Sequence, residues 1–236
     1  MARLPRINLP DIPQHIIQRG NNRQACFYHE HDYAFYLSKL LEYTQKYEVE
    51  VHAFVLMTNH VHLLLTPKQT SAISQVMQAL GRSYVRYINT RYQRTGTLWE
   101  GRHKASLVDS EHYFLILSRY IELNPVRANM TSQPGDYPWS SYQGNALGKS
   151  IKLLTPHKIY QQLGHSDSER QLHYRELCKQ AIPQKTIDEL RHHTNKGWVI
   201  GDEQFKKDIE AKLARKIQTD QHGGDRKSKR FKPSNQ

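Results

Sequence analysis

Cysteine is scarce in this sequence, and long apolar segments are missing. The two cysteines, Cys26 and Cys178, are far apart and form no Cys-x-x-Cys pair, so neither a disulfide framework nor a zinc finger is indicated. No uncharged apolar run reaches the roughly 18 residues of a membrane-spanning helix, and residues 1–13 contain no apolar segment of the signal-peptide kind. We therefore expect no membrane partner and a reducing, cytoplasmic setting.

Acidic residues are also in short supply relative to basic ones. The 236 residues include 34 Lys and Arg against 22 Asp and Glu, a formal net charge of +12. Such a balance indicates a polyanionic partner, because Lys and Arg that neutralise phosphates release condensed counterions. Charge alone does not separate DNA from RNA or from an acidic membrane surface. The length fits one large domain, or a catalytic domain with a smaller appendage.

Hydrophobic periodicity and turn residues predict an alternating order of strands and helices in the first half of the chain. Strands are expected at 15–19, 51–57 and 60–65, with extended chain at 98–108. Helices are expected after a cap at Asp32, over 71–92, and from a cap at Ser110 through Tyr120. The order β, α, β, β, α, β, α predicts an α+β sheet with helices on one face.

The character of the sequence changes after Asn129. Residues 133–138 resemble a loop, and helical patches follow at 156–163, 169–179 and 186–192, with a last amphipathic helix over 205–217. We expect a catalytic domain at 1–130, a loop-rich and helical extension at 131–222, and a basic, disordered tail at 223–236. That tail holds five basic residues and one acidic residue, which is consistent with a non-specific DNA clamp or with simple solubility.

His60-Val61-His62 is the sharpest local feature. On a strand, side chains at i and i+2 point to the same face, with α-carbons about 7 Å apart. Two imidazoles placed in this way can share one metal ion, while Val61 faces the core behind them. The competing interpretation is two ordinary histidines on a half-exposed strand, in a chain with 14 histidines. Imidazole suits zinc, manganese or nickel better than magnesium, so the motif does not identify its metal.

Tyr120 and Asn124 form a second candidate pair, since residues at i and i+4 of a helix share a face. A tyrosine can attack a phosphodiester and conserve the bond energy in a covalent phosphotyrosine, and Asn124 can supply an oxygen ligand to a metal. The chain has 14 tyrosines, most of which serve packing or the surface. Asn124 also precedes Pro125, which biases it away from the α region unless it begins a new helical turn.

Several segments together resemble the REP-associated branch of the tyrosine transposases that act on single-stranded DNA. Residues 58–65 contain the His-hydrophobic-His pattern known as the HUH motif, and residues 18–23, 96–108 and 119–128 resemble further segments of this branch in the same order. The resemblance covers roughly residues 14–145. Asn124 falls where related insertion-sequence enzymes often have glutamine, a departure that the REP-associated branch shares.

The resemblance implies a ferredoxin-like antiparallel sheet with helices packed on it, and the helical patches after residue 130 predict a mostly helical C-terminal extension. It implies that Tyr120 is the nucleophile, forming a 5′-phosphotyrosine, and that His60, His62 and Asn124 bind a divalent metal, magnesium or manganese. The implied partner is a single-stranded DNA hairpin from repetitive extragenic palindromes, bound by a monomer or homodimer associated with the nucleoid. Our candidates for DNA contact are basic side chains, and Trp99 for stacking on an unpaired base. The basic candidates are Arg19, Arg23, Arg82, Arg86, Arg94, Arg102 and Lys104.

Two other interpretations stay open from the sequence. One is an HUH replication nickase or nuclease, which would cleave without efficient rejoining. The other is a non-catalytic nucleic-acid-binding regulator, because ferredoxin-like sheets also bind RNA. An unperturbed phenol ionises near pH 10, and no residue of the sequence identifies itself as the base that would activate the tyrosine.

Overall fold

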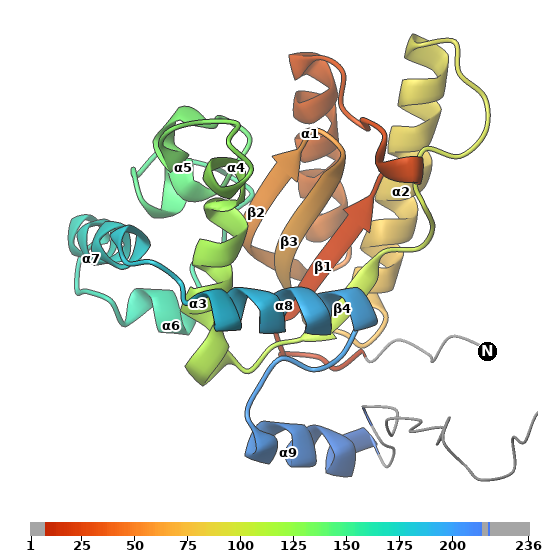
Figure 1. The fold of residues 1–236 in the computed structure, drawn as a ribbon. Helices are drawn as coiled ribbons and strands as arrows, with labels where there is room; N and C mark the ends of the chain where they lie inside the picture. The colour runs from red at the N-terminus through yellow and green to blue at the C-terminus, as the bar shows by residue number, and fades with distance from the viewer. Residues whose placement is uncertain (1–7, 214–216, 218–236) are drawn as a thin grey trace, which may run out of the picture.

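A computed structural model describes residues 8–213 and residue 217. The expected tail at 223–236 lies outside the described residues. At the centre of the described part is a four-stranded antiparallel sheet in the order β2-β3-β1-β4 (Figure 1). The strands are β1 (Gln14–Arg19), β2 (Val49–Met57), β3 (His60–Pro67) and β4 (Lys104–Leu107).

Two long helices connect the strands, and the remaining helices follow the last strand. The connecting helices are α1 (Glu30–Lys46) and α2 (Ala72–Arg91). After β4 come α3 (Ser110–Glu122), α4 (Asn124–Arg127), α5 (Tyr142–Asn145), α6 (Lys158–Gln161), α7 (Asp167–Lys179), α8 (Gln184–Lys196) and α9 (Glu203–Leu213). Two 3-10 turns, η1 (Asn21–Arg23) and η2 (Pro134–Asp136), complete the described part. The chain order and strand order are those of a ferredoxin-like fold, which confirms the expected fold class.

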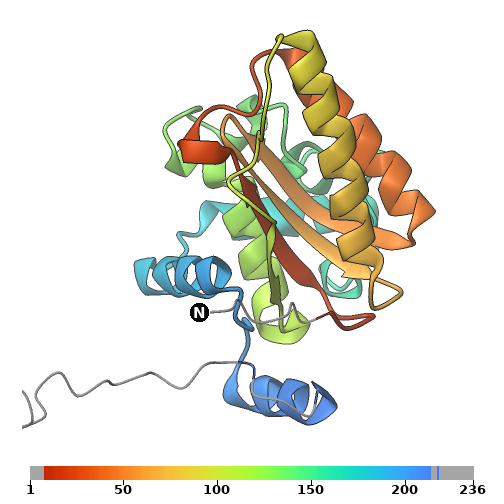
Figure 2. The ribbon, with the colours of Figure 1, turned by 90° about the vertical axis from the view of Figure 1, so that its right-hand side faces the viewer.

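Both faces of the sheet are covered, which differs from the expectation of helices on one face. Along β3, Val61, Leu63 and Leu65 pack into the core shared with α1 and α2, because alternate side chains of a strand point to opposite faces. Leu64 packs into a second core with α3 and α8. Figure 2 shows α1 and α2 on one side of the sheet, with α3 and α8 on the other. The hydrophobic pattern of β3 shows that both of its faces are buried, but it does not show that α3 and α8 cover the second face.

Helix starts differ by one to three residues from the sequence interpretation. Asp32 is not the cap of α1 but its third residue, where its carboxylate accepts the backbone N–H groups of Tyr28 and His29. Likewise Asp109, not Ser110, caps α3 by accepting the N–H of Glu111 at 3.0 Å. Of the extended stretch expected at 98–108, the strand β4 occupies only its second half.

The extension beyond residue 130 returns to the sheet. The carbonyl of Trp139 accepts the N–H of Leu56 on β2, and Ser141 donates to Phe54 of the same strand. α8 packs across β4 and β1 (Figure 1). Within the described residues, no helix combines the length and apolar character needed to cross a bilayer. The second face of the sheet, with His60 and His62 on it, therefore lies against α3 and, from the last third of the chain, α8.

Candidate active site

The His-Val-His segment lies on β3 with both imidazoles on the face that α3 covers. Val61 points into the opposite core, as expected. Nδ1 of His60 is 2.6 Å from Oδ1 of Asn59, and the Asn59 amide is oriented by its Nδ2, which donates to the carbonyl of Arg23 at 3.0 Å. Because an amide oxygen only accepts, Nδ1 of His60 is the donor and its Nε2 keeps a lone pair.

His62 is 3% exposed and its Nδ1 lies 2.8 Å from Nε2 of His15 on β1. The His60 and His62 rings have centroids 5.0 Å apart, at an interplanar angle of 79°. In both rings Nδ1 is therefore occupied by a hydrogen bond, and Nε2 is the nitrogen left for a ligand. This is the arrangement that metal-binding histidines show, with the second nitrogen held by an outer partner.

Burial keeps both imidazoles neutral. It lowers the pKa of His60 to about 4, with a further contribution from the positive charge of Arg19, which pairs with His60 across the strands. Burial also lowers the pKa of His62 well below its usual range, assisted by the neighbouring charged groups. Neutral imidazole is the form that binds metal ions, so both side chains are ready to act as ligands near pH 7.

Tyr120 and Asn124 line the same cavity as the two histidines. This cavity has a volume of about 220 Å³, and its lining is Ile17, Arg19, His60, His62, Tyr120, Asn124, Arg191, Thr194 and Asn195. The Tyr120 ring is 6% exposed and stands edge-on to His62, with centroids 6.0 Å apart. Asn124 begins the short helix α4, with Pro125 in its first turn, so the proline does not remove Asn124 from the cavity.

Arg127 lies over the phenol ring. Its guanidinium carbon is 4.4 Å from the centroid of Tyr120, and the same guanidinium donates to the backbone carbonyl of Tyr120. Burial lowers the pKa of Arg127 to about 10, which still leaves it charged near pH 7. A cation therefore sits against the π face of the candidate nucleophile.

The cavity continues into a groove along the edge of the sheet. Arg19 also lines an adjoining cavity of about 430 Å³ with Arg102 and Lys104. Arg102 in turn lines a third cavity, of about 790 Å³, with Arg82 and Arg86 of α2. Five of the seven basic candidates for DNA contact therefore share one continuous surface with Tyr120. We call these three adjoining cavities the basic groove.

The other three DNA-contact candidates have different positions. Arg94 donates to the hydroxyl of Tyr28 and stacks on its ring, and Arg23 holds Asn59 through its carbonyl; neither lines the basic groove. Trp99 is 6% exposed and stacks on Tyr84 in the core, although one edge reaches the third cavity. Its main contacts are thus those of a core residue.

Sequence reasoning missed the residues that α8 and β1 contribute. Arg191, Thr194 and Asn195 come from α8 and wall the cavity opposite β3, and no local motif marks them. His15 had a detectable signal, because the alternation of His15, Ile17 and Arg19 places all three on the face of the sheet where the histidine pair lies. Arg127 falls within a segment that resembles the family but had no assigned role.

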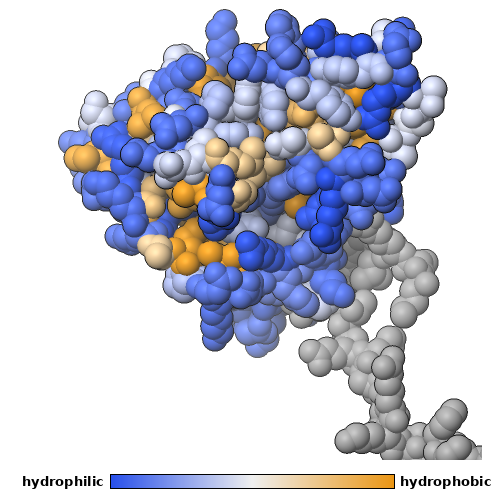
Figure 3. Space-filling model, turned by 45° about the horizontal axis from the view of Figure 1, so that its top comes forward, coloured by the Kyte–Doolittle hydropathy of each residue, from blue (hydrophilic) through white to orange (hydrophobic). Residues whose placement is uncertain are grey.

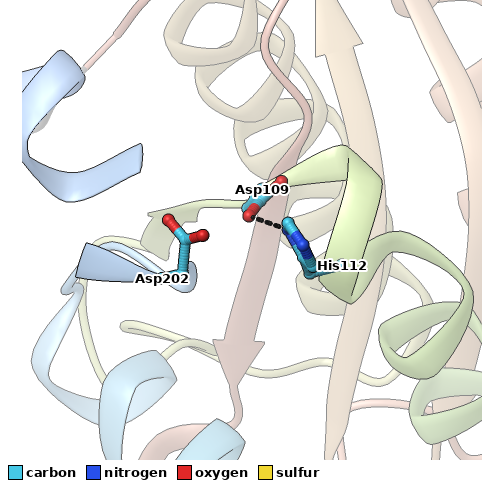
Figure 4. Close-up of side chains that lie close together, drawn as sticks. All are labelled: Asp109, His112 and Asp202. Atoms are coloured by element: carbon cyan, nitrogen blue, oxygen red, sulfur yellow. Dashed lines mark hydrogen bonds and ion pairs between the residues drawn. The ribbon is translucent and has the colours of Figure 1, made fainter. Parts of the chain in front are cut away.

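Other clusters and cavities do not include the predicted site residues. Asp109, His112 and Asp202 lie close enough to share a metal ion (Figure 4). Their atoms already have structural partners, since Asp109 caps α3 and contacts His112 at 2.8 Å, while Asp202 accepts the N–H of Phe205.

A cavity of about 850 Å³ beside Leu147 and Ile182 is mostly apolar, and Figure 3 shows hydrophobic side chains gathered on that side, towards α5 and α7. We place the candidate site at Tyr120 and the histidine pair.

Comparison with known proteins agrees with this architecture. A structure described as the REP-associated tyrosine transposase bound to a REP hairpin aligns with a TM-score of 0.55 and 16% identity, over 66% of this chain and 93% of that chain. A putative transposase from Deinococcus radiodurans has a TM-score of 0.35 at 23% identity, covering 51% and 96% of the two chains. The latter score is below the level that indicates a shared fold. No curated protein gives a significant match.

The sequence itself identifies the family. Residues 9–124 match the family described as Transposase IS200 like. The matched segment contains the whole sheet, both histidines of β3, Tyr120 and Asn124. Through this segment the chain belongs to the IS200-like transposases, and it is an enzyme of that class.

Proposed function

We propose that this transposase is a metal-dependent endonuclease and strand transferase that cuts single-stranded DNA with Tyr120 and rejoins it. The observation that supports this most directly is the single cavity that holds Tyr120, His60, His62 and Asn124. All four residues come from one chain, so the proposed site needs no residue from a second copy.

The donor set fits a divalent metal, and manganese better than magnesium, because two of its three donors are imidazoles. Nε2 of His60, Nε2 of His62 and the amide oxygen of Asn124 would hold it. When bound, the ion would polarise the scissile phosphate and offset the charge that develops on it. The open sides of the cavity leave positions for the phosphate oxygens.

The proposed steps at the protein are those that the family resemblance implies for Tyr120. The phenol gives up its proton to solvent as its oxygen forms a bond to phosphorus, the bond from phosphorus to the 3′ oxygen breaks, and the departing oxygen takes up a proton from solvent. The products are a 5′-phosphotyrosine and a free 3′-hydroxyl. Attack of a 3′-hydroxyl on that linkage restores the phosphodiester and releases Tyr120. Arg19, beside His60, is placed to bind the phosphate, and Arg127 to stabilise negative charge on the phenol.

The basic groove indicates the form of the substrate. It leads from Tyr120 along β1 to α2 and presents arginines along its length, an arrangement suited to the backbone of a nucleic acid. A hairpin from a repetitive extragenic palindrome is the proposed substrate, by analogy with the structure that binds a REP hairpin. We further propose a catalytic unit at 1–130 and an extension at 131–222 that walls the site.

A covalent-adduct assay tests the proposal. The full chain is incubated with labelled single-stranded hairpin oligonucleotides and Mn²⁺ or Mg²⁺, and denaturing gels are read for a protein–DNA adduct. Tyr120→Phe should abolish adduct and cleavage while leaving DNA binding nearly unchanged, because only the attacking oxygen is lost. Tyr113→Phe is the matched control, since the Tyr113 hydroxyl is on the same helix but faces Glu189. Adduct formation by Tyr120→Phe would place the nucleophile elsewhere.

A further inference from the structure

His15 is a fully buried histidine that the proposed reaction does not use directly. It is 0% exposed on β1, and both of its ring nitrogens have partners. Nε2 is 2.8 Å from Nδ1 of His62, and Nδ1 is 2.9 Å from the hydroxyl oxygen of Thr194 on α8. The rings of His15 and His62 are nearly coplanar, with an interplanar angle of 14° and centroids 5.1 Å apart, as an in-plane hydrogen bond between their nitrogens requires. Thr194, His15 and His62 thus form a continuous hydrogen-bonded chain from α8 to the cavity.

The donor-to-acceptor direction of these two hydrogen bonds decides whether Nε2 of His62 can bind a metal ion. If His62 donates through Nδ1, His15 accepts at Nε2 and donates through its own Nδ1 to Thr194, and Nε2 of His62 keeps its lone pair. In the reverse direction Nε2 of His62 would have the proton and could not bind a metal ion. We propose that His15, held by Thr194, is a positioning residue that fixes His62 in the metal-binding tautomer and orientation. This inference rests on the metal site of the proposed function.

The two histidines of β3 differ in how they obtain this support. His60 receives it from Asn59, its neighbour in the sequence. His62 receives it from a strand that precedes it by 47 residues and, beyond that, from a helix that follows His15 by 179 residues. A partner on the second imidazole nitrogen fixes the ring and raises its basicity as a ligand, and its loss commonly lowers metal affinity 10- to 100-fold. The position of α8 is thereby coupled to metal binding.

Metal titration of the full chain without DNA tests this assignment. Mn²⁺ affinity is measured calorimetrically for the unaltered protein and for His15→Leu, His15→Gln and Thr194→Val. We expect His15→Leu to bind Mn²⁺ about 10- to 100-fold more weakly. His15→Gln should stay within a few-fold, because its amide oxygen can accept from His62 and its amide nitrogen can donate to Thr194. Thr194→Val should show a smaller loss than His15→Leu.

His52 provides the matched control. It is also buried, at 4% exposure, and both of its ring nitrogens have partners, the carbonyl of Thr155 and the hydroxyl of Thr66. His52 does not line the cavity. His52→Leu should therefore lower thermal stability without changing Mn²⁺ affinity, which separates a general packing defect from a loss of ligand positioning.

Nitrogen-15 NMR of the unaltered, zinc-loaded protein gives a second readout that does not depend on a variant folding. Protons on Nδ1 of both His15 and His62 support the assignment, and a proton on Nε2 of His62 overturns it. Unchanged Mn²⁺ affinity in His15→Leu, combined with lost affinity in His60→Ala, also overturns it while leaving the proposed function intact. If His60→Ala binds Mn²⁺ as tightly as the unaltered protein, the metal site of the proposed function itself fails.

Discussion

The surroundings of the Tyr120 oxygen favour charge stabilisation over a dedicated base. Among the described residues that line the cavity, none is an aspartate or a glutamate. The two cavity imidazoles offer only Nε2, which the proposed metal would occupy. Two cations are adjacent to the phenol. Arg127 lies over the Tyr120 ring, and Arg19 on β1 lines the same cavity. A phenolate forming at this position would be stabilised by these fixed charges, as developing anions are in other preorganised sites.

Replacing Arg127 with glutamine should slow cleavage near pH 7 by roughly tenfold or more, because each 1.4 kcal/mol of lost stabilisation costs a factor of ten. Single-turnover cleavage rates near pH 7 measure this loss. Arg175→Gln is the control, since Arg175 also donates to a backbone carbonyl, that of Ala146, away from the site. An equal loss in the two variants would assign Arg127 a purely structural role.

Replacing either histidine of β3 should remove metal-dependent cleavage. His60→Ala or His62→Ala leaves one imidazole, which is too few ligands to retain a weakly held divalent ion, and chelator should mimic either change. His112→Ala is the comparison, because His112 belongs to the separate cluster with Asp109 and Asp202. Cleavage assays with added EDTA and then excess Mn²⁺ give the readout. Activity that persists in EDTA would remove the metal from the mechanism.

At the scale of elements, Glu122 connects α3, the helix with Tyr120, to the extension. It lies two residues after Tyr120 on α3 and is completely buried. Its carboxyl group accepts hydrogen bonds from Ser141, Asn145 and Tyr174, which lie in the extension. One side chain thus links α3 to α5, α7 and the loop between α4 and α5. Burial raises the pKa of this carboxyl to about 7, although the three hydrogen bonds act in the opposite direction.

This raised pKa predicts a pH-dependent stability. The folded state binds the Glu122 proton more tightly than the unfolded state, so its contribution is complete below about pH 4.5 and is lost as the pH rises through about 7. The difference between 4.5 and about 7 corresponds to roughly 3 kcal/mol. Glu122→Gln stays neutral and keeps an acceptor for Ser141 and Asn145, so it should gain stability relative to the unaltered protein as the pH rises. Urea unfolding midpoints from pH 5 to 8 measure this difference, and parallel curves would refute the assignment.

The sequence predicted the strand and the helix that hold the candidate site better than it predicted α8, the helix that closes the cavity. The strand with His60 and His62 and the helix with Tyr120 were predicted from local periodicity, because alternation and capping depend on neighbouring residues. Asn124 was harder, since the proline after it competes with helix continuation, and α4 resolved that conflict by starting a new turn. The position of α8 depends on contacts with residues far away in the sequence, such as Ser106, 87 positions from His193, and His15, 179 positions from Thr194, which no local pattern encodes. Arg191 and Thr194 were therefore beyond sequence reasoning.

At the scale of the molecule, the basic groove joins α2 to the reaction centre. Arg82 and Arg86 are exposed on one side of α2 and line the far end of the groove. Tyr120 lies at the other end, beyond Arg102 and Arg19. A single DNA strand bound along this path would contact basic side chains on both α2 and the sheet. The basic residues on α2 lie far from Tyr120, so we expect them to affect DNA affinity and not the cleavage step.

The double variant Arg82→Gln/Arg86→Gln should therefore weaken DNA binding and leave cleavage at saturating DNA unchanged. Each lost phosphate contact should reduce the dependence of log affinity on log salt by about 0.7 for a single strand. Fluorescence anisotropy at several salt concentrations measures this slope. Lys149→Gln/Lys152→Gln removes the same charge from exposed positions outside the groove. Equal slopes for the two double variants would show that the net charge, not the groove, attracts the DNA.

The wall that α8 forms also has a consequence for the timing of synthesis. A ribosome makes the chain from residue 1 onward, so the histidine pair and Tyr120 emerge well before Arg191, Thr194 and Asn195. A nascent chain that ends before α8 has Tyr120 and both imidazoles but lacks one side of the cavity, and His15 lacks its outer partner. The complete cavity of the candidate site therefore forms only after translation has passed residue 195.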